Sequence, residues 1–527
     1  MTRSLQLADV FEIVADAVPD RLALMTNDAE LTYAQLDERS TRLANHLRAY
    51  GIARGDHVAI HARNCVEWIE SFYGCFKLGA VPINVNYRYV AAELRYLYDN
   101  ADCVAVIVAP EYVAAIDEVT DALPNLRLRL VIGPEYEAAL AAASATRDFP
   151  GRDASDMYMV YTGGTTGMPK GVMWRHEDII LAAMNASRQS RPIERPEQLG
   201  EEAAASGFPL RLMAMGPVMH GGAQWAMGNA YVSGGTFVMY TGRRFDAHDV
   251  LRLAERSKAN SISTMGDAMA RPLAEALMAP EAPSYDLSML FAFGNGGAPL
   301  SATVREQIRT ALPKIAILDS YGASETGAAG SRADAGEGFS APRFNVGPDT
   351  MVLDDDGEPC APGVTGRLAR SGNIPLGYYK DPEKTAATFP VYGGRRWVIP
   401  GDFARVEADG SISVLGRGSV SINSGGEKIY PEEVEAALKA HPAVFDAVVV
   451  GTPNPQWGEQ VTALVQIRAD HEAPTVANLV AHCRTLVADY KSPKRVFIVS
   501  EVQRTPVGKA DYQWAKAEAA RLLGVNP

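Results

Sequence analysis

Cysteine is scarce in this chain of 527 residues, with five scattered copies and no Cys-x-x-Cys pair. A disulfide framework needs paired cysteines, and a structural zinc site needs closely spaced Cys or His ligands. The sequence therefore predicts neither, and free thiols favour a reducing compartment such as the cytoplasm. The cysteines are Cys65, Cys75, Cys103, Cys360 and Cys483.

Long apolar runs and an excess of positive charge are also missing. Acidic residues interrupt the N-terminal segment 1–20, which argues against a signal peptide, and the Ala-rich segment 138–145 is too short to span a bilayer. Fifty basic against 63 acidic side chains give a net charge of −13, which argues against a general nucleic-acid or anionic-membrane binder. We expect a soluble, cytoplasmic protein whose anionic ligands are held by local cations or backbone N–H groups.

Short β-branched runs such as 104–108 alternate with amphipathic stretches such as 31–47. This alternation predicts an α/β fold with parallel strands and crossover helices. A Gly/Ser-rich segment, 416–426, precedes Pro431, which occupies the favoured first position of a helix. We predict a boundary there, with one domain over 1–418 and a second over 419–527. The alternative is a surface loop inside one large domain.

A glycine- and threonine-rich segment, 161–171, follows an apolar run that predicts a buried strand. Its glycines let backbone N–H groups converge, its threonine hydroxyls add donors and Lys170 adds positive charge, so the segment is suited to bind phosphate. It lacks the Gly-Lys-Ser/Thr ending of a Walker A loop, and the structural alternative is a polar turn. The candidate phosphate ligands are Thr162, Gly163, Gly164, Thr165, Thr166, Gly167 and Lys170.

This segment resembles the phosphate loop T-S-G-T-T-G-x-P-K-G of the adenylate-forming enzymes, which include acyl-CoA synthetases, firefly-type luciferases and peptide-synthetase adenylation domains. Gly163 replaces the serine of that loop. Five further segments resemble motifs of the same family, in the same order along the chain. They are Gly296-Gly297-Ala298-Pro299, Tyr321-Gly322-Ala323-Ser324-Glu325, Gly401-Asp402, Gly416-Arg417 and Arg504-Thr505-Pro506-Val507-Gly508-Lys509.

The resemblance implies a role for each segment. Gly296, Gly297, Ala298, Tyr321 and the adjoining Gly322 would contact the adenine, and Asp402 would bind the ribose. Ser324 would contact a phosphate, Glu325 would help to hold Mg²⁺, and Arg417 would contact the nucleotide. The implied catalytic residues are Lys509, Glu325 and Lys170. Pro400 stands where the family motif before Asp402 has threonine.

The resemblance also implies the architecture. It consists of a large N-terminal domain of stacked α/β sheets with a small β-barrel-like subdomain, followed by a small mobile C-terminal α/β domain. In the family, the second domain rotates between an adenylating and a thioester-forming pose. Ser419 occupies the pivot position, and Gly425 and Gly426 would approach the thiol when Lys509 leaves.

Segments 167–178, 266–272 and 416–428 resemble more closely a group of bacterial acyl-CoA synthetases that includes ligases of steroid side-chain acids. We therefore expect an ATP-dependent acyl-CoA synthetase that uses ATP, Mg²⁺ and coenzyme A. It would activate a medium-chain, long-chain or bulky alicyclic carboxylic acid as acyl-AMP, release pyrophosphate and transfer the acyl group to CoA. The alternatives are a ligase that loads a carrier protein and a non-catalytic nucleotide-binding protein. The sequence leaves a homodimer open.

The acyl site is expected near the segment 217–221, which resembles the P-x-x-H-G stretch at the family's carboxylate site. Taken alone, a histidine, methionine or aromatic residue in an apolar segment is as readily a packed core residue. No carboxylate lies between Pro217 and Gly228, which disfavours amino-acid activation, although Asp267 is a reserve partner for a substrate amine. The candidate acyl-site residues are His220, Gly221, Trp225, Thr264 and Met265.

Overall fold

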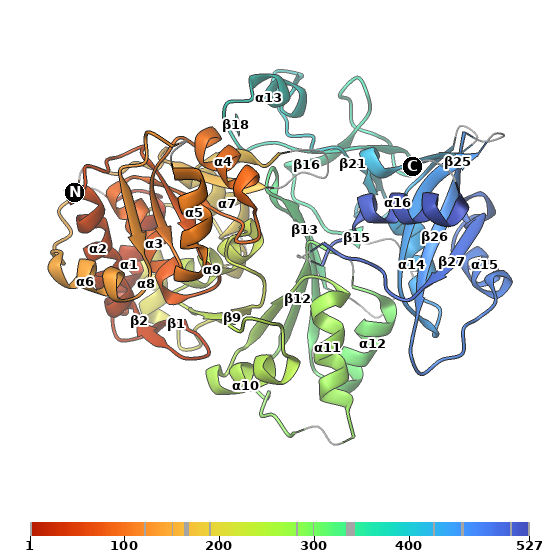
Figure 1. Ribbon diagram of the computed structural model, residues 1–527, viewed down its shortest axis with the longest axis horizontal. Coiled ribbons are helices and arrows are strands. Elements are labelled where there is room, and N and C mark those ends of the chain that lie inside the picture. Colours follow the sequence, from red (N-terminus) through yellow and green to blue (C-terminus); the bar gives the residue numbers. More distant parts are fainter. Residues whose placement is uncertain are drawn as a thin grey trace.

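The computed structural model describes residues 3–120, 123–149, 151–162, 168–188, 191–280, 283–298, 300–333, 343–424, 427–454, 458–505 and 508–524. A large N-terminal part, red to green in Figure 1, is followed by a smaller C-terminal part in blue. Both parts combine helices with sheets, so the predicted α/β class is confirmed.

An eight-stranded sheet runs in the order β14-β13-β12-β11-β9-β10-β1-β2. Its neighbouring strands are parallel except at the two edges, where β2 and β14 pair antiparallel. Helices α10, α11 and α12 pack on it because Leu251, Leu273 and Ile308 join one apolar cluster with Ile262 and Phe293. The bounds are β1 Leu22–Met25, β2 Glu30–Thr32, β9 Arg211–Ala214, β10 Thr236–Met239, β11 Ser261–Thr264, β12 Ala292–Gly296, β13 Ala316–Ala323, β14 Gly327–Ala333, α10 Ala247–Ser257, α11 Asp267–Met278 and α12 Ala302–Ala311.

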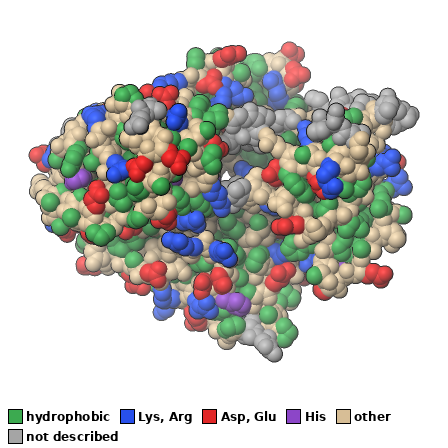
Figure 2. Space-filling view, viewed as in Figure 1, with side chains coloured by type: hydrophobic (Ala, Val, Ile, Leu, Met, Phe, Trp, Pro, Cys, Tyr) green, Lys and Arg blue, Asp and Glu red, His purple; other side chains and the backbone are tan. Residues whose placement is uncertain are grey.

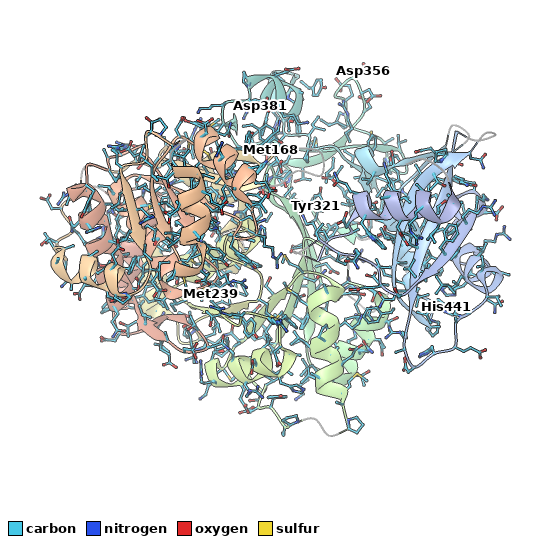
Figure 3. All side chains as sticks on the ribbon, in the orientation of Figure 1. Met168, Met239, Tyr321, Asp356, Asp381 and His441 are labelled. Atoms are coloured by element: carbon cyan, nitrogen blue, oxygen red, sulfur yellow. The ribbon has the colours of Figure 1, made fainter. Side chains whose placement is uncertain are left out.

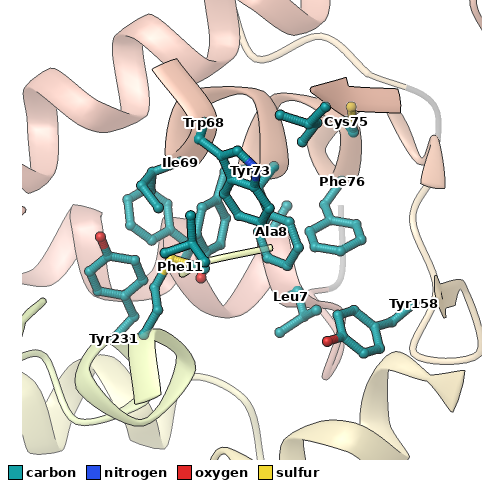
Figure 4. Packing of buried hydrophobic residues seen from close by; sticks show 14 of the residues in the cluster. Leu7, Ala8, Phe11, Trp68, Ile69, Tyr73, Cys75, Phe76, Tyr158 and Tyr231 are labelled. Carbon is teal, nitrogen blue, oxygen red and sulfur yellow. The ribbon is translucent and has the colours of Figure 1, made fainter. Parts of the chain in front are cut away.

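A four-stranded sheet, β4-β3-β5-β6, is parallel throughout, and a three-stranded sheet, β18-β8-β7, is antiparallel. Aromatic rings fill the core beside them: the Phe11 ring centroid lies 4.5 Å from that of Tyr73 and 5.2 Å from that of Tyr231 (Figure 4). The bounds are β3 His57–His61, β4 Val81–Asn84, β5 Cys103–Val108, β6 Leu128–Val131, β7 Met157–Thr162, β8 Lys170–Arg175, β18 Gly377–Tyr378, α1 Leu7–Ala17, α2 Tyr33–Ala49, α3 Val66–Leu78, α4 Ala91–Asn100, α5 Val113–Thr120, α6 Pro134–Ala142, α7 His176–Ala183, α8 Gln198–Ala205 and α9 Gly221–Val232.

A five-stranded antiparallel sheet, β15-β22-β21-β17-β16, follows where the resemblance implies a barrel-like unit. In the described residues β15 and β16 are its edge strands. Val352, Leu368, Ala404 and Ile412 pack on one side of it. The bounds are β15 Arg343–Phe344, β16 Thr350–Leu353, β17 Thr365–Arg370, α13 Pro382–Thr388, β19 Val391–Tyr392, β20 Arg395–Arg396, β21 Asp402–Val406 and β22 Ile412–Arg417.

The C-terminal part is built on the sheet β24-β23-β26-β25, with β27 parallel to β26. Two apolar clusters pack around this sheet, one with residues of α14 and α15 and the other with residues of α16. A short 3₁₀ turn, Gly418–Val420, separates it from the preceding sheet, and the boundary at residue 418 stays a prediction. The bounds are β23 Ile422–Ser424, β24 Glu427–Ile429, α14 Pro431–Lys439, β25 Val444–Asn454, β26 Gly458–Ile467, α15 Val476–Arg484, β27 Arg495–Val499 and α16 Tyr512–Leu523.

The five cysteines are all free, in line with the expected absence of a disulfide framework. Across the described ranges, no helix combines the length and apolar character needed to cross a bilayer.

A lysine lies buried in the N-terminal core with its charge compensated. Lys77 Nζ donates to Glu12 Oε1 at 2.7 Å and to Asp37 Oδ1 at 2.6 Å. Arg152 binds Glu12, and Arg147 binds Asp37. Burial by itself raises the pKa of Glu12, but the charge of Lys77 and the hydrogen bond from Arg152 outweigh burial and lower this pKa to about 2.

We expect Lys77→Met to lower the free energy of unfolding by up to about 3–5 kcal/mol, because the buried carboxylates of Glu12 and Asp37 would each lose one cationic partner and keep only an arginine. Folding lowers the pKa of Glu12 from 4.5 to about 2, so its contribution to stability is present above pH 4.5 and is lost as the pH falls towards 2. Urea denaturation at pH 7 and pH 4 measures both effects. Lys516→Met, at an exposed position of α16, is the control, and equal destabilisation by the two substitutions would contradict the prediction.

Candidate active site

The predicted adenine segment lies at the carboxyl end of β12, where ligands commonly bind in parallel sheets. Asn295 holds this turn: its side-chain amide donates to Ala298 O at 3.1 Å, and its Oδ1 accepts from Gly266 N at 2.8 Å. Gly297 has φ +74°, a conformation that favours glycine. At Gly296, a Cβ atom would lie 2.6 Å from Ser320 Oγ, so only glycine lets the turn pass so close to β13.

The predicted adenine and ribose residues lie in direct contact although they are 81 positions apart. The Tyr321 hydroxyl donates to Asp402 Oδ2 at 2.6 Å, which links β13 to the start of β21. The ring of Phe344 lies 5.6 Å from the ring of Tyr321. Gly322 permits the adjoining bulge between β13 and β14, because a Cβ atom there would collide with the carbonyl oxygen of Gly327.

The predicted phosphate segment connects β7 to β8, with Thr162 and Lys170 paired across the two strands. Gly163, Gly164, Thr165, Thr166 and Gly167 lie outside the described residues. Lys170 forms an ion pair with Asp381, and its Nζ lies 5.9 Å from the ring centroid of Tyr378. Figure 3 shows Asp381 and Met168 in the upper part of the view, with Tyr321 below them near the centre. Both side chains of the ion pair are about one third exposed, so a phosphate can compete for Lys170 at modest cost.

Glu325 is held by a tyrosine from the short strand β18. The Tyr378 hydroxyl donates to Glu325 Oε1 at 3.0 Å. The buried Trp174 donates its indole N–H to Ser324 O at 3.0 Å, which fixes the turn beside Glu325. The described residues contain no cluster of three or more His, Cys, Asp or Glu that could enclose a metal ion. A single oriented carboxylate nevertheless suits Mg²⁺, which takes one or two carboxylates together with phosphate oxygens.

Asn84, at the end of β4, joins the phosphate segment to the predicted acyl segment. Its side-chain amide donates to Tyr161 O at 2.8 Å and to Met219 O at 2.7 Å, and its Oδ1 accepts from Tyr161 N at 2.8 Å. Sequence reasoning missed this residue, because one asparagine after a β-branched run carries no signal for such long-range contacts. Asn64 plays a similar part by accepting from Val218 N at 2.9 Å.

His220 caps the start of α9 and is neutral at physiological pH. Burial, followed by the positive charges of Lys509 and Arg88, lowers its pKa to about 4. Among the described residues, the His220 Nε2 atom has no hydrogen-bond partner. Lys509 belongs to the C-terminal part, and its loop lies beside this segment: a Cβ atom at Gly508 would lie 3.7 Å from the carbonyl oxygen of Met265, a predicted acyl-site residue.

Of the remaining predicted acyl-site residues, Trp225 and Met265 pack against nearby glycines, whereas the Thr264 hydroxyl is used in a hydrogen bond within the sheet. Trp225 packs on Gly221, where a Cβ atom would lie 3.3 Å from the indole, and Met265 lies near both Gly216 and Gly297. Met265 therefore lies between the acyl segment and the adenine segment. Thr264 is buried, and its hydroxyl donates to Gly294 O at 3.0 Å, so that group is committed to strand β12.

Asp267, the reserve partner for a substrate amine, is already engaged. Its two oxygens accept from Arg271 at 2.7 Å and from the backbone N–H of Ser301 at 2.7 Å. Its negative charge is already paired with the Arg271 guanidinium, which makes it a weaker partner for a substrate amine than an unpaired carboxylate. The geometry therefore favours an acid without an amino group over an amino acid.

The structure also assembles a basic cluster that the sequence did not reveal. At the carboxyl ends of β4, β3 and β5, the guanidinium groups of Arg63 and Arg88 lie 4.8 and 5.3 Å from the ring centroid of Tyr87. Arg63 also donates to the Tyr112 hydroxyl at 2.8 Å and to Arg243 O at 3.3 Å. Basic side chains are visible beside the central hollow in Figure 2. Only the topology brings these separate segments together, and their charge opposes the acidic average of the chain.

The remaining predicted residues lie in the Gly/Ser-rich segment 416–426, which connects the two parts of the chain. The backbone of Arg417 pairs with that of Asp402 across β21 and β22. The side chains of Arg417 and Ser419 are not among those that the structure describes. Gly425 and Gly426 also lie outside the described residues.

The predicted adenine turn, the Tyr321–Asp402 contact, the oriented Glu325 and the lysine loop of the C-terminal part together fit the class of site expected of adenylate-forming enzymes. The chain belongs to the AMP-binding enzyme family. The family model described as "AMP-binding enzyme" matches residues 11–379, and the one described as "AMP-binding enzyme C-terminal domain" matches residues 433–509.

Full-length relatives share this family. The chain is 47% identical to the 3-oxocholest-4-en-26-oate–CoA ligase of Rhodococcus rhodochrous, over 97% of this chain and 96% of that enzyme. It is 45% identical to the medium/long-chain-fatty-acid–CoA/3-oxocholest-4-en-26-oate–CoA ligase of Mycobacterium tuberculosis, over 98% of this chain and 97% of that enzyme.

Solved structures agree with the fold. ATP-bound MatB from Rhodopseudomonas palustris superposes with a TM-score of 0.82 at 26% identity, covering 97% of this chain and 98% of that one. The anthranilate CoA ligase AuaEII in complex with anthranoyl-AMP superposes with a TM-score of 0.85 at 24% identity, covering 99% of this chain and 98% of that one.

We expect Tyr378→Phe to raise the KM for ATP about tenfold, because Glu325 would lose a hydrogen bond to its charged carboxylate. Steady-state kinetics at saturating magnesium measures this change. Tyr379→Phe is the matched control, since its neighbouring hydroxyl donates instead to Asp102 at 2.7 Å. The same KM shift in both variants would refute a specific role for Tyr378.

Proposed function

We propose that this protein is an ATP-dependent acyl-CoA synthetase that converts a carboxylic acid to acyl-AMP and then to acyl-CoA. The observation that carries the proposal is the position of the lysine loop: at Gly508, the residue before Lys509, a Cβ atom would lie 3.0 Å from Ala268 Cβ and 3.7 Å from Met265 O, beside the predicted acyl site. Tyr321 and Asp402 lie in contact at the predicted nucleotide site. For ATP to activate a carboxylate, the bound nucleotide and the bound acid must both lie within reach of one lysine side chain.

In the proposed first half-reaction, the substrate carboxylate attacks the α-phosphorus of ATP, and pyrophosphate leaves. Negative charge develops around the phosphorus, so the chain must supply fixed positive charge and alignment. Lys509 would bridge the α-phosphate and the carboxylate, while Lys170 and Thr162 would hold the leaving pyrophosphate. Tyr321 and Asp402 would fix the adenosine at the other end.

Glu325 would hold Mg²⁺ together with phosphate oxygens of ATP. The ion, when bound, supplies neutralising charge for those oxygens. Tyr378 orients the carboxylate for this task through its hydroxyl.

The proposed substrate is a medium-chain, long-chain or bulky alicyclic acid. The names of the relatives at 45–47% identity support this class. A neutral His220, with Trp225 packed on the adjoining Gly221, suits the carboxyl end of an apolar acid, because it adds no charge to an apolar surrounding. Asp267 is already paired with Arg271, which weakens it as a partner for a substrate amine.

In the proposed second half-reaction, the thiol of CoA attacks the acyl-adenylate carbonyl, and AMP leaves. Residues 419–527 would rotate as one unit about Ser419, withdraw Lys509 and bring Gly425 and Gly426 towards the thiol. Free cysteines fit the proposed cytoplasmic location. Transfer to a carrier protein is the runner-up function.

Pyrophosphate release with a panel of carboxylic acids, with and without CoA, tests the proposal. We expect release with fatty or alicyclic acids, and a thioester of matching mass when CoA is added. Acyl-AMP without thioester would favour carrier loading. A chain that binds ATP but releases no pyrophosphate with any acid would be a binding protein.

We predict that Lys509→Ala lowers the adenylation rate at least about 10²-fold, the typical effect of removing one transition-state donor. The same variant should still form thioester from supplied acyl-AMP. Quench-flow measurement of each half-reaction separates the two steps. Equal loss of both would contradict the assignment of Lys509 to adenylation alone.

A further inference from the structure

Arg271 on α11 carries a contact between the two parts of the chain that neither half-reaction accounts for. Its side chain is almost fully buried, and its Cζ atom lies 4.8 Å from the ring centroid of Phe445 on β25. The same guanidinium donates to Phe445 O at 3.2 Å. A buried arginine stacked on an aromatic face binds more strongly than an exposed one, because the guanidinium has already lost its water.

The N-terminal side of this contact is rigidly anchored. Asp267, one helical turn before Arg271, accepts from its guanidinium at 2.7 Å. The other oxygen of Asp267 accepts from Ser301 N, just before α12. Arg271 is therefore held through Asp267 to both α11 and α12. Because its side chain is already ordered, the contact with Phe445 costs little further side-chain entropy.

The C-terminal side leads directly to the lysine loop. Phe445 is the extra residue of a register shift between Val444 and Asp446. Asp446 Oδ2 accepts from Arg504 Nε at 2.8 Å, and Arg504 pairs with Ala510 across the loop that carries Lys509. Arg271, Phe445, Asp446 and Arg504 thus form a continuous series of contacts that ends at Lys509.

A second contact lies beside the first. At Gly508, a Cβ atom would lie 3.0 Å from Ala268 Cβ, so the lysine loop rests on the first turn of α11. Gly508 has φ +79°, which favours glycine at this close approach. The helix that bears Arg271 therefore also supports the residue that precedes Lys509.

We infer that Arg271 is a positioning residue that holds the C-terminal part in the arrangement in which Lys509 reaches the acyl site. The inference rests on the proposed function, since it assigns Arg271 to the first half-reaction. Rotation of the C-terminal part for thioester formation has to break the Arg271–Phe445 contact. Loss of the contact consequently slows adenylation and leaves the second half-reaction free.

The test measures the two half-reactions separately in Arg271→Ala and Phe445→Ala. Each variant should lose adenylation about tenfold, which is the effect of removing one desolvated cation–aromatic contact. Thioester formation from supplied acyl-AMP should stay within about twofold of the parent rate. The double variant should be no slower than the slower single variant, because both substitutions remove the same contact.

Two further variants separate positioning from general damage. Phe445→Tyr keeps the aromatic face and should restore adenylation. Arg188→Ala is the matched control, since Arg188 is equally buried but pairs with Glu202 at 2.7 Å within the N-terminal part. It should reduce thermal stability without changing the ratio of the two half-reaction rates. Equal loss of both half-reactions in Arg271→Ala, or additive losses in the double variant, would overturn the inference.

Amide hydrogen exchange in Arg271→Ala and the parent provides a readout that does not require activity. The amides of Thr505, Gly508 and Lys509 should exchange faster in the variant, because the loop loses its support on α11. If the parent releases no pyrophosphate with any acid, the proposed function fails while this structural measurement still stands. Unchanged exchange would overturn the positioning role itself.

Discussion

The buried amide of Asn84 is the contact on which the site's geometry depends. It binds the backbone at Tyr161 and at Met219, so one side chain connects the strand before the phosphate segment to the residue before His220. A buried amide must satisfy its donors and its acceptor, which makes this arrangement highly specific. The carboxyl end of the four-stranded parallel sheet is thereby fixed against the acyl segment, and the basic cluster around Tyr87 follows three residues further along the chain.

Positive side chains are concentrated locally in this protein, although its net charge is negative. The chain as a whole is acidic, with a net charge of −13, yet Arg63 and Arg88 gather on Tyr87, and Lys170 lies at the predicted phosphate segment. Lys170 is partly balanced by Asp381, whereas His220 is kept neutral by burial and by the nearby cations. Such an arrangement attracts phosphate at one place and leaves the rest of the surface repulsive to polyanions.

Much of the nucleotide site was predictable from local sequence, because glycine-rich turns and short polar motifs act through their own backbone. The motifs predict that Tyr321 and Asp402 both bind the nucleotide, and in the structure these two side chains lie in contact. The acyl side was harder to predict. Thr264 has the right position in the sequence, but its buried hydroxyl binds Gly294, and a short motif does not reveal such a partner. Asn84, Arg63 and Arg271 were missed because their partners lie far away in sequence.

Taken alone, the sequence determined the fold class, the family and the order of the nucleotide motifs, since periodicity, turn residues and consecutive motif letters are local properties. The tertiary structure decided which residues come into contact: Tyr378 with Glu325, Gly508 of the lysine loop with Ala268, and Arg271 with Phe445. These contacts depend on the order of the strands in each sheet and on how the C-terminal part lies against α11. Hydrophobic burial fixes both across hundreds of residues, so no short stretch of sequence encodes them.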